Sequence, residues 1–167
     1  WEKLLTLGLD PESVRPELDF VTAADVEGSA SPEKGAPLAT ADGVLRIALL
    51  GGSHGAVLAY DASLTTTDGS VVGVFDDAKN LLSSEGVPLL GNLSTDFLSS
   101  YEAGDFDACL ITVQADMPTR VRLHEQCVEA SIPLATVIHS RASIAPSARV
   151  GGGCLILDGS RIGPRAL

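Results

Sequence analysis

Short apolar runs alternate with segments of helical periodicity between Leu45 and Ile138. The apolar runs predict four strands, which we place at 45–50, 71–75, 108–113 and 132–138. A shorter extended piece is expected at 87–91, and helices are expected at about 55–64, at 94–102 and from Pro118 onward. Strands that alternate with helices favour an α/β fold, in which helices cover both faces of a parallel sheet.

The helical periodicity also predicts which side chains face the sheet. We expect the first helix to turn Val57, Leu58 and Ala62 inward. The helix that follows Pro118 is expected to turn four apolar side chains inward. These are Val121, Leu123, Cys127 and Val128.

A different period begins at Ile138. Five aliphatic residues recur every six positions: Ile138, Ile144, Val150, Ile156 and Ile162. Four positions after each of them stands a small residue: Ala142, Ala148, Cys154, Ser160 and Ala166. A period of six fits neither a helix nor a simple strand. It predicts a β-helix, in which each hexad forms one flat side with its aliphatic residue pointing inward.

These patterns divide the chain into three parts. Residues 1–43 are rich in proline and glycine and hold nine acidic against three basic side chains, so we interpret them as an acidic extension or linker. Residues 44–137 form the predicted sheet domain, and residues 138–167 begin the β-helix. Because the chain starts at Trp1 and holds only about five hexads, we expect it to be a fragment of a longer protein.

Composition narrows the classes of function. A net charge of −11 argues against nucleic acid or an anionic membrane surface as a partner. No apolar run is long enough for membrane insertion, and three scattered cysteines indicate small buried thiols in a reducing cytoplasm. No spacing typical of a metal site is present, so no metal is expected.

The candidate binding residues follow the ends of predicted strands, where parallel sheets hold their ligands. A Gly-Gly-Ser-His-Gly loop follows the first strand, and its backbone can approach a phosphate-bearing ligand closely. Two aspartates follow this loop by about twenty residues, where a carboxylate can accept bonds from a ribose, and an arginine follows the third strand. The predicted binding set is Gly51, Gly52, Ser53, His54, Gly55, Asp76, Asp77 and Arg120.

Each candidate also has a purely structural interpretation. The glycines can serve a tight strand-to-helix turn, the aspartates a solvated turn and Arg120 a surface ion pair. We expect His124 on a helix surface and His139 bonded to a nearby backbone carbonyl. No arrangement typical of a catalytic triad is found.

The chain resembles the sugar O- and N-acyltransferases of the sialic-acid and bacillosamine (UDP-4-amino-sugar) acetyltransferase family over about residues 45–167. Three stretches carry the resemblance: the loop at 51–55, the Val-Gly-Val-Phe-Asp-Asp sequence at 72–77 and Val-Pro-Leu-Leu-Gly at 87–91. The most specific stretch is 138–148, which looks like the family's entry into a left-handed β-helix. The chain differs at Leu50 and at 114–116, where the family usually carries glycine.

The resemblance implies a small Rossmann-like domain that binds a UDP-sugar-type acceptor, followed by a left-handed β-helix that assembles as a homotrimer. It implies acetyl-CoA as co-substrate, bound mostly outside this chain, and a histidine base beyond Leu167. On this interpretation the chain contains no catalytic residue and is inactive alone. Two alternatives stay open: a non-catalytic module that binds a ligand or drives oligomerisation, and an NAD-type dehydrogenase domain, for which the loop lacks the full glycine spacing.

Overall fold

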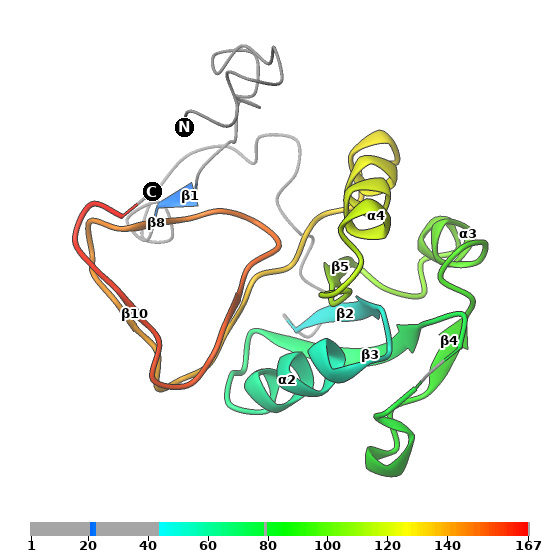
Figure 1. Ribbon diagram of the computed structural model, residues 1–167, viewed down its shortest axis with the longest axis horizontal. Helices are drawn as coiled ribbons and strands as arrows, with labels where there is room; N and C mark the ends of the chain where they lie inside the picture. Colours follow the sequence, from blue (N-terminus) through cyan, green and yellow to red (C-terminus); the bar gives the residue numbers. More distant parts are fainter. Residues whose placement is uncertain (1–20, 23–43, 79, 167) are drawn as a thin grey trace.

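The computed structural model describes residues 21–22, 44–78 and 80–166 (Figure 1). The prediction of an irregular acidic extension over 1–43 therefore lies outside the described residues, apart from Val21–Thr22. Two regions follow along the described chain, and we call them the sheet domain (44–136) and the coil (137–166).

A four-stranded parallel sheet forms the centre of the sheet domain. Its strands lie in the order β4 (Leu89–Gly91), β3 (Gly69–Phe75), β2 (Leu45–Leu50) and β5 (Ala108–Ile111). All neighbouring strands pair in parallel, which confirms the predicted α/β class and three of the four predicted strands. The carboxyl ends of β2 and β5 lie side by side, because Leu50 pairs with Ile111.

Helices cover both faces of this sheet (Figure 1). The helices are α2 (His54–Ser63), α3 (Phe97–Glu102) and α4 (Met117–Glu129), and a single 3-10 turn, η1, spans Ser83–Glu85. Side chains of β2 alternate between two cores. Ile47 and Leu49 join α2 in one, whereas Ala48 and Leu50 join α3 and α4 in the other.

The predicted inner faces of the helices were partly wrong. Helix α2 buries Ala56, Ala59 and Ala62, so Ala62 is confirmed, and Val57 packs half-buried against the same core. Leu58 is only half-buried. Alanines spaced three apart let the helix approach the sheet closely, which larger side chains would prevent.

In α4 the residues spaced four apart, Leu123 and Cys127, are buried as expected. Val121 and Val128 are instead 50% and 61% exposed. Val121 is two residues before the buried Leu123, and Val128 is one residue after the buried Cys127. Residues one or two apart in a helix do not share a face, so both valines point away from the sheet. Hydrophobicity alone did not reveal this difference.

The predicted fourth strand at 132–138 was wrong as a single element. Only Leu134 bridges to the sheet, beside Cys109 of β5, and the fourth sheet strand is the short β4. The chain then leaves the sheet, since Val137 and Ile138 form β6 and pair with the coil. Pro133 has no N–H to donate, so it cannot extend a ladder in both directions.

The hexad segment winds into a triangular coil (Figure 1). Its short strands are β6 (Val137–Ile138), β7 (Ser143–Ile144), β8 (Arg149–Val150), β9 (Leu155–Ile156) and β10 (Arg161–Ile162). Val137 pairs in parallel with Leu155, and Ser143 with Arg161, a separation of 18 residues in each case. Three hexads thus make one turn of the coil.

One more strand lies at the edge of the coil, where β1 (Val21–Thr22) pairs antiparallel with β8. Among the residues that the structure describes, none of the helices combines the length and the apolar character needed to cross a bilayer.

Candidate functional site

The glycine loop joins β2 to α2 and is fixed by the neighbouring β5 segment. Gly51 has φ of +113°, and a Cβ there would lie 2.8 Å from Val113 Cγ2. A Cβ on Gly55 would collide with the carbonyl oxygen of Thr112. Thr112 Oγ1 also donates to the carbonyl oxygen of Gly51, at 2.6 Å. Glycine is therefore required at 51 and 55 by backbone conformation and by close approach.

The two predicted aspartates turn toward the protein's own backbone. Asp76 Oδ2 accepts a hydrogen bond from the Gly52 N–H at 2.6 Å, and Oδ1 accepts from the Ala78 N–H at 2.8 Å. Asp77 Oδ1 accepts from both the N–H and the hydroxyl of Ser94, at 3.1 Å each. Asp76 thus holds the glycine loop, and Asp77 holds the segment before α3.

Ser53 and His54 begin helix α2. Ser53 stands at the N-cap in an extended conformation, and its side chain makes no capping bond. His54 is exposed to solvent. The first N–H groups of a helix have no partner within the helix, so this turn presents backbone donors at the carboxyl edge of the sheet.

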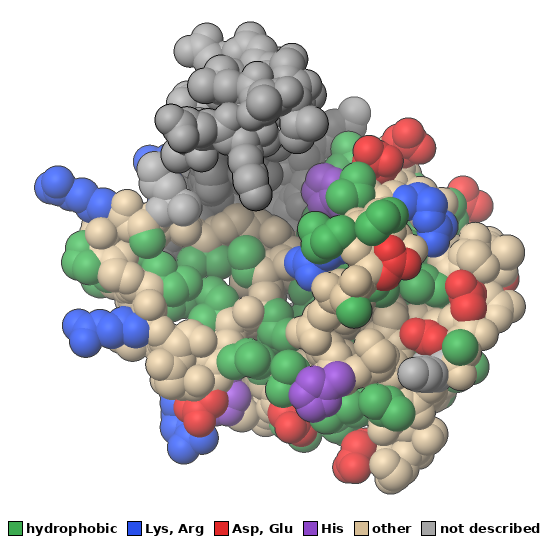
Figure 2. Space-filling model, viewed as in Figure 1, with side chains coloured by type: hydrophobic (Ala, Val, Ile, Leu, Met, Phe, Trp, Pro, Cys, Tyr) green, Lys and Arg blue, Asp and Glu red, His purple; other side chains and the backbone are tan. Residues whose placement is uncertain are grey.

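A cavity of about 680 Å³ lies between the sheet domain and the coil. Figure 2 shows the hollow between these two regions with hydrophobic side chains along it. The sheet domain contributes five residues to its lining: Gly55, Ile111, Thr112, Gln114 and Arg120. Most of the coil's contribution comes from residues 149–157. A volume of this size is typical of a small-molecule site.

Only two of the predicted binding residues, Gly55 and Arg120, line this cavity. Gly51, Gly52, Ser53 and His54 form the loop that leads to Gly55, and Asp76 is bonded to that loop. Asp77 faces the segment before α3 instead. Of the predicted binding residues, some therefore line the cavity and the others hold the segments beside it.

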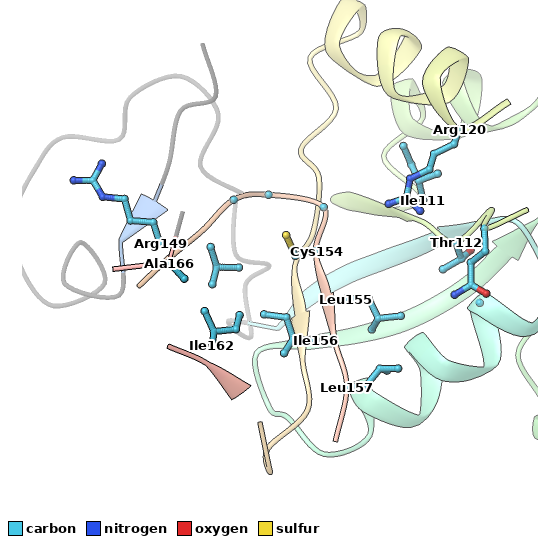
Figure 3. A pocket seen from close by; sticks show the side chains of 16 residues that line it. Ile111, Thr112, Arg120, Arg149, Cys154, Leu155, Ile156, Leu157, Ile162 and Ala166 are labelled. Carbon is cyan, nitrogen blue, oxygen red and sulfur yellow. The ribbon is translucent and has the colours of Figure 1, made fainter. Parts of the chain in front are cut away.

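Arg120 is the predicted residue with the clearest access to a ligand. Its guanidinium points into the cavity in Figure 3 and donates from Nη1 to the Val113 carbonyl oxygen at 3.3 Å. In the part of the chain that the structure describes, Arg120 forms no ion pair with an acidic side chain. A half-buried cation without a counter-ion attracts an anionic group.

The start of α4 determines where Arg120 lies. Asp116 caps the helix by accepting from the N–H and the hydroxyl of Thr119, at 3.2 and 2.7 Å. These bonds lower the pKa of Asp116, because they stabilise the carboxylate form. With Pro118 in the first turn, the cap fixes the position of Arg120 beside the end of β5.

Sequence reasoning missed several residues that line the cavity, among them Gln114, Gly151–Gly153 and Cys154. Three consecutive glycines between two hexads are typical of a corner of the coil. Gly153 does have φ of +74°, but a Cβ on Gly152 would lie 3.2 Å from the Leu134 carbonyl oxygen. Close packing of the coil against the sheet domain therefore also favours glycine at 152, and no local sequence signal predicts that contact.

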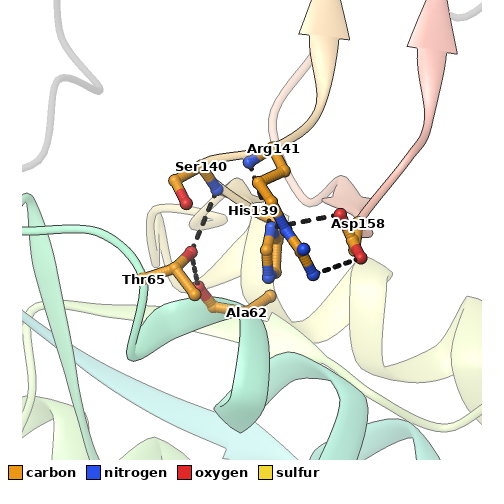
Figure 4. Close-up of polar contacts among 6 residues, drawn as sticks. All are labelled: Ala62, Thr65, His139, Ser140, Arg141 and Asp158. Atoms are coloured by element: carbon orange, nitrogen blue, oxygen red, sulfur yellow. Dashed lines mark hydrogen bonds and ion pairs between the residues drawn. The ribbon is translucent and has the colours of Figure 1, made fainter.

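His139 lies at the start of the coil, where polar contacts connect the coil to the end of helix α2 (Figure 4). His139 Nδ1 accepts from the Arg141 N–H at 3.1 Å and lies 3.9 Å from Asp158 Oδ1. The Ser140 N–H donates to Thr65 Oγ1 at 3.0 Å. We expected the His139 side chain to bond a backbone carbonyl. Instead, its Nδ1 accepts a hydrogen bond from a backbone N–H, that of Arg141.

This bond also bears on chemistry at His139. A neutral imidazole that accepts at Nδ1 carries its proton on Nε2, so Nε2 cannot act as a base in that state. His124 is exposed on α4, as expected. Among the described residues, no group of three or more His, Cys, Asp or Glu side chains could hold a metal ion.

Two of the cysteines form a buried contact. Cys109 Sγ and Cys127 Sγ lie 3.5 Å apart between β5 and α4. Their hydrogen bond and burial raise the pKa of Cys109, which keeps it in the neutral thiol form. These two are therefore structural thiols, whereas Cys154 is half-buried and lines the cavity.

Comparison with solved structures finds the same fold in acetyltransferases. A mutant of perosamine N-acetyltransferase from Caulobacter crescentus, in complex with CoA and GDP-perosamine, matches with a TM-score of 0.61 and 21% identity. The match covers 71% of this chain and 54% of that chain. The acetyltransferase domain of PglB from Neisseria gonorrhoeae, in complex with acetyl coenzyme A, matches with a TM-score of 0.57 and 19% identity. That match covers 74% of this chain and 60% of that chain.

At these identities the comparison shows a shared fold, a parallel sheet with flanking helices that runs into further β-structure. The chain spans between 54% and 60% of the length of these two solved proteins. No protein-family model matches the sequence, and no curated protein matches it.

Proposed function

We propose that this chain is the acceptor-binding part of an acetyl-CoA-dependent acetyltransferase that acts on a nucleotide-linked amino sugar or sugar hydroxyl. The sheet domain is then a Rossmann-like domain, and the coil is the start of a left-handed β-helix that forms a homotrimer in the complete protein. The shared fold with sugar N-acetyltransferases supports this assignment.

The observation that carries the proposal is the position of Arg120. Its guanidinium faces a cavity of about 680 Å³, beside Gly55 at the start of α2. The whole chain has a net charge of −11, so general attraction does not bring an anion to it. A local cation in a cavity of this size suits the phosphates of a nucleotide-linked sugar.

The proposed chemistry is direct acyl transfer. The sugar amine or hydroxyl attacks the thioester carbonyl of acetyl-CoA, a C–N or C–O bond forms, and the CoA thiolate leaves while a base takes the acceptor's proton. The described lining of the cavity contains no histidine or carboxylate. We therefore assign this chain acceptor binding, and we place the base and most of the CoA groove outside residues 1–167.

The same observation keeps a second candidate open. A cavity with arginines but no histidine or carboxylate among its described lining residues also suits a non-catalytic module that binds an anionic ligand. Leu50, at a place where the resembling family usually has glycine, is fully buried in the sheet core. It therefore favours neither candidate.

Calorimetric titration with UDP, GDP, a UDP-4-amino sugar, NAD and acetyl-CoA tests the proposal. We expect a UDP- or GDP-linked compound to bind and Arg120→Ala to weaken its binding about ten-fold or more, the effect of losing a charge-assisted hydrogen bond. Arg122→Ala is the matched control, because it removes the same charge from an exposed position of α4 outside the cavity. Equal weakening by both variants, or no nucleotide binding at all, would contradict the proposal.

A further inference from the structure

The two adjacent aspartates use their carboxylates differently. Asp76 engages two backbone N–H groups with two different oxygens, Oδ2 with Gly52 and Oδ1 with Ala78. Asp77 uses a single oxygen, Oδ1, for both of its bonds to Ser94. An isosteric amide can replace the second arrangement but not the first, because an amide offers only one oxygen.

Asp76 also connects three segments of the sheet domain. Its own N–H donates to the Gly91 carbonyl oxygen at 3.1 Å, and its carboxylate reaches back to the glycine loop and forward to Ala78. The Gly52 carbonyl in turn accepts from the Leu81 N–H at 3.0 Å. Gly52 is therefore held on both its N–H and its carbonyl side.

This attachment has consequences for a bound anion. A phosphate cannot take the Gly52 N–H while Asp76 holds it at 2.6 Å, and a carboxylate at that place repels a second negative charge. The loop continues from Gly52 through Ser53 into α2, and only its last residue, Gly55, lines the cavity. The position of Gly52 thus determines where Gly55 meets a ligand.

We propose that Asp76 is a positioning residue, whose carboxylate shapes the glycine loop and does not contact the ribose of a bound nucleotide. This inference rests on the proposed function, since it concerns the same ligand. It differs from the role that the sequence predicts for a carboxylate about twenty residues beyond a glycine loop.

The test compares Asp76→Asn with wild type for two ligands, GDP or UDP and inorganic pyrophosphate, which lacks a ribose. The introduced amide leaves one backbone N–H facing its nitrogen, so the loop shifts and both ligands lose affinity by a similar factor, about ten-fold. A ribose contact would weaken only the nucleotide. It would leave pyrophosphate binding unchanged, or strengthen it, because a negative charge is removed.

A second readout separates loop positioning from a general loss of stability. We expect Asp76→Asn to increase hydrogen exchange at whichever of the Gly52 and Ala78 N–H groups faces the amide nitrogen. We expect Asp77→Asn to leave exchange at the Ser94 N–H unchanged, because the side-chain amide keeps the single oxygen that Ser94 uses. Glu129→Gln, exposed at the end of α4, controls for the loss of one surface charge on binding.

The outcomes separate this inference from the function on which it rests. If wild-type protein binds neither UDP nor GDP, the proposed function is wrong. If it binds a nucleotide and Asp76→Asn weakens nucleotide but not pyrophosphate, the proposed function stands and the positioning role is wrong. Unchanged exchange at both the Gly52 and the Ala78 N–H groups in Asp76→Asn would also overturn the positioning role.

Discussion

The sheet domain and the coil are both built from parallel strands, yet they bury their side chains to very different extents. Leu49, Phe75 and Leu110 in the sheet domain are at most 1% exposed. Of the five aliphatic residues that recur every six positions in the coil, only Ile156 is buried, at 8% exposed. Helices close the sheet on two faces, whereas a stack of turns is closed only by further turns or by another chain.

One sequence can therefore combine two sources of stability. The sheet domain supplies its own core and holds Arg120 in a fixed place at the cavity. The coil gains stability from each neighbour that stacks on it, so its contribution depends on what lies beyond its described edge. The cavity lies between these two regions and draws residues from both.

Deletion of a buried side chain should show the largest difference in stability between the sheet domain and the coil. Phe75 packs against Phe97 and Phe106, with ring centroids 6.4 and 5.9 Å away, so Phe75→Ala should lower the free energy of unfolding by about 3–5 kcal/mol. Ile144→Ala, in the half-buried interior of the coil, should cost less than about 2 kcal/mol. Urea unfolding followed by circular dichroism measures both. Equal losses would show that the coil has a core as tight as that of the sheet.

Addition of a methyl group at a glycine should show an intermediate difference in stability between the two regions. Gly55→Ala places a Cβ against the Thr112 carbonyl and should destabilise the protein by about 1–3 kcal/mol and weaken nucleotide binding. Gly163→Ala in the coil meets no atom within 4 Å, so no loss of stability is expected. Thermal unfolding and calorimetric titration provide the measurements. A stable, fully binding Gly55→Ala variant would show that α2 can move away from β5 without consequence.

Removal of an ion pair should show the smallest difference in stability between the two regions. Arg46 bonds Asp107 at 2.8 Å in the sheet domain and lowers the pKa of Asp107. A lowered folded-state pKa means stabilisation that is present above the unfolded value of about 3.9 and lost as pH falls through the folded value. Asp107→Asn should therefore flatten the acid side of the stability–pH curve.

The coil provides the control for this prediction. Arg141 and Asp158 form a pair whose side chains are 72% and 49% exposed, so Asp158→Asn should change stability by less than about 1 kcal/mol. Urea titrations between about pH 2 and pH 7 compare the two variants. A larger acid-side change for Asp158→Asn than for Asp107→Asn would contradict the assignment of the stronger pair to the sheet domain.

The sequence predicted most elements of the fold because their signals are local. Leu45–Leu50 is a continuous apolar run beside a glycine loop, and the six-residue period beginning at Ile138 reappears as strands 18 residues apart. The stretch 132–138 misled the prediction, since its apolar residues serve the sheet at Leu134 and the coil at Val137. Periodicity cannot show where a continuous apolar run changes its partner.

The candidate site was less accessible to prediction. The glycine spacing predicted the loop, and the arginine that follows the third predicted strand is Arg120. The cavity itself depends on how the coil packs against the sheet domain. Gln114 and Gly152 line it through contacts between segments far apart in the chain, and such contacts leave no local pattern. Which of the predicted residues bind a ligand, and where the domain boundaries lie, stay predictions.

Strand β9 has a consequence for how such proteins can be recombined. Ile156 points into the coil, while its neighbours Leu155 and Leu157 pack against the sheet core (Figure 3). Adjacent residues of one short segment thus serve two different modules. A graft that joins this sheet domain to a foreign coil must carry over Leu155 and Leu157 as well. The boundary between the two modules therefore cannot be drawn at a single peptide bond, because alternate residues of this segment belong to different modules.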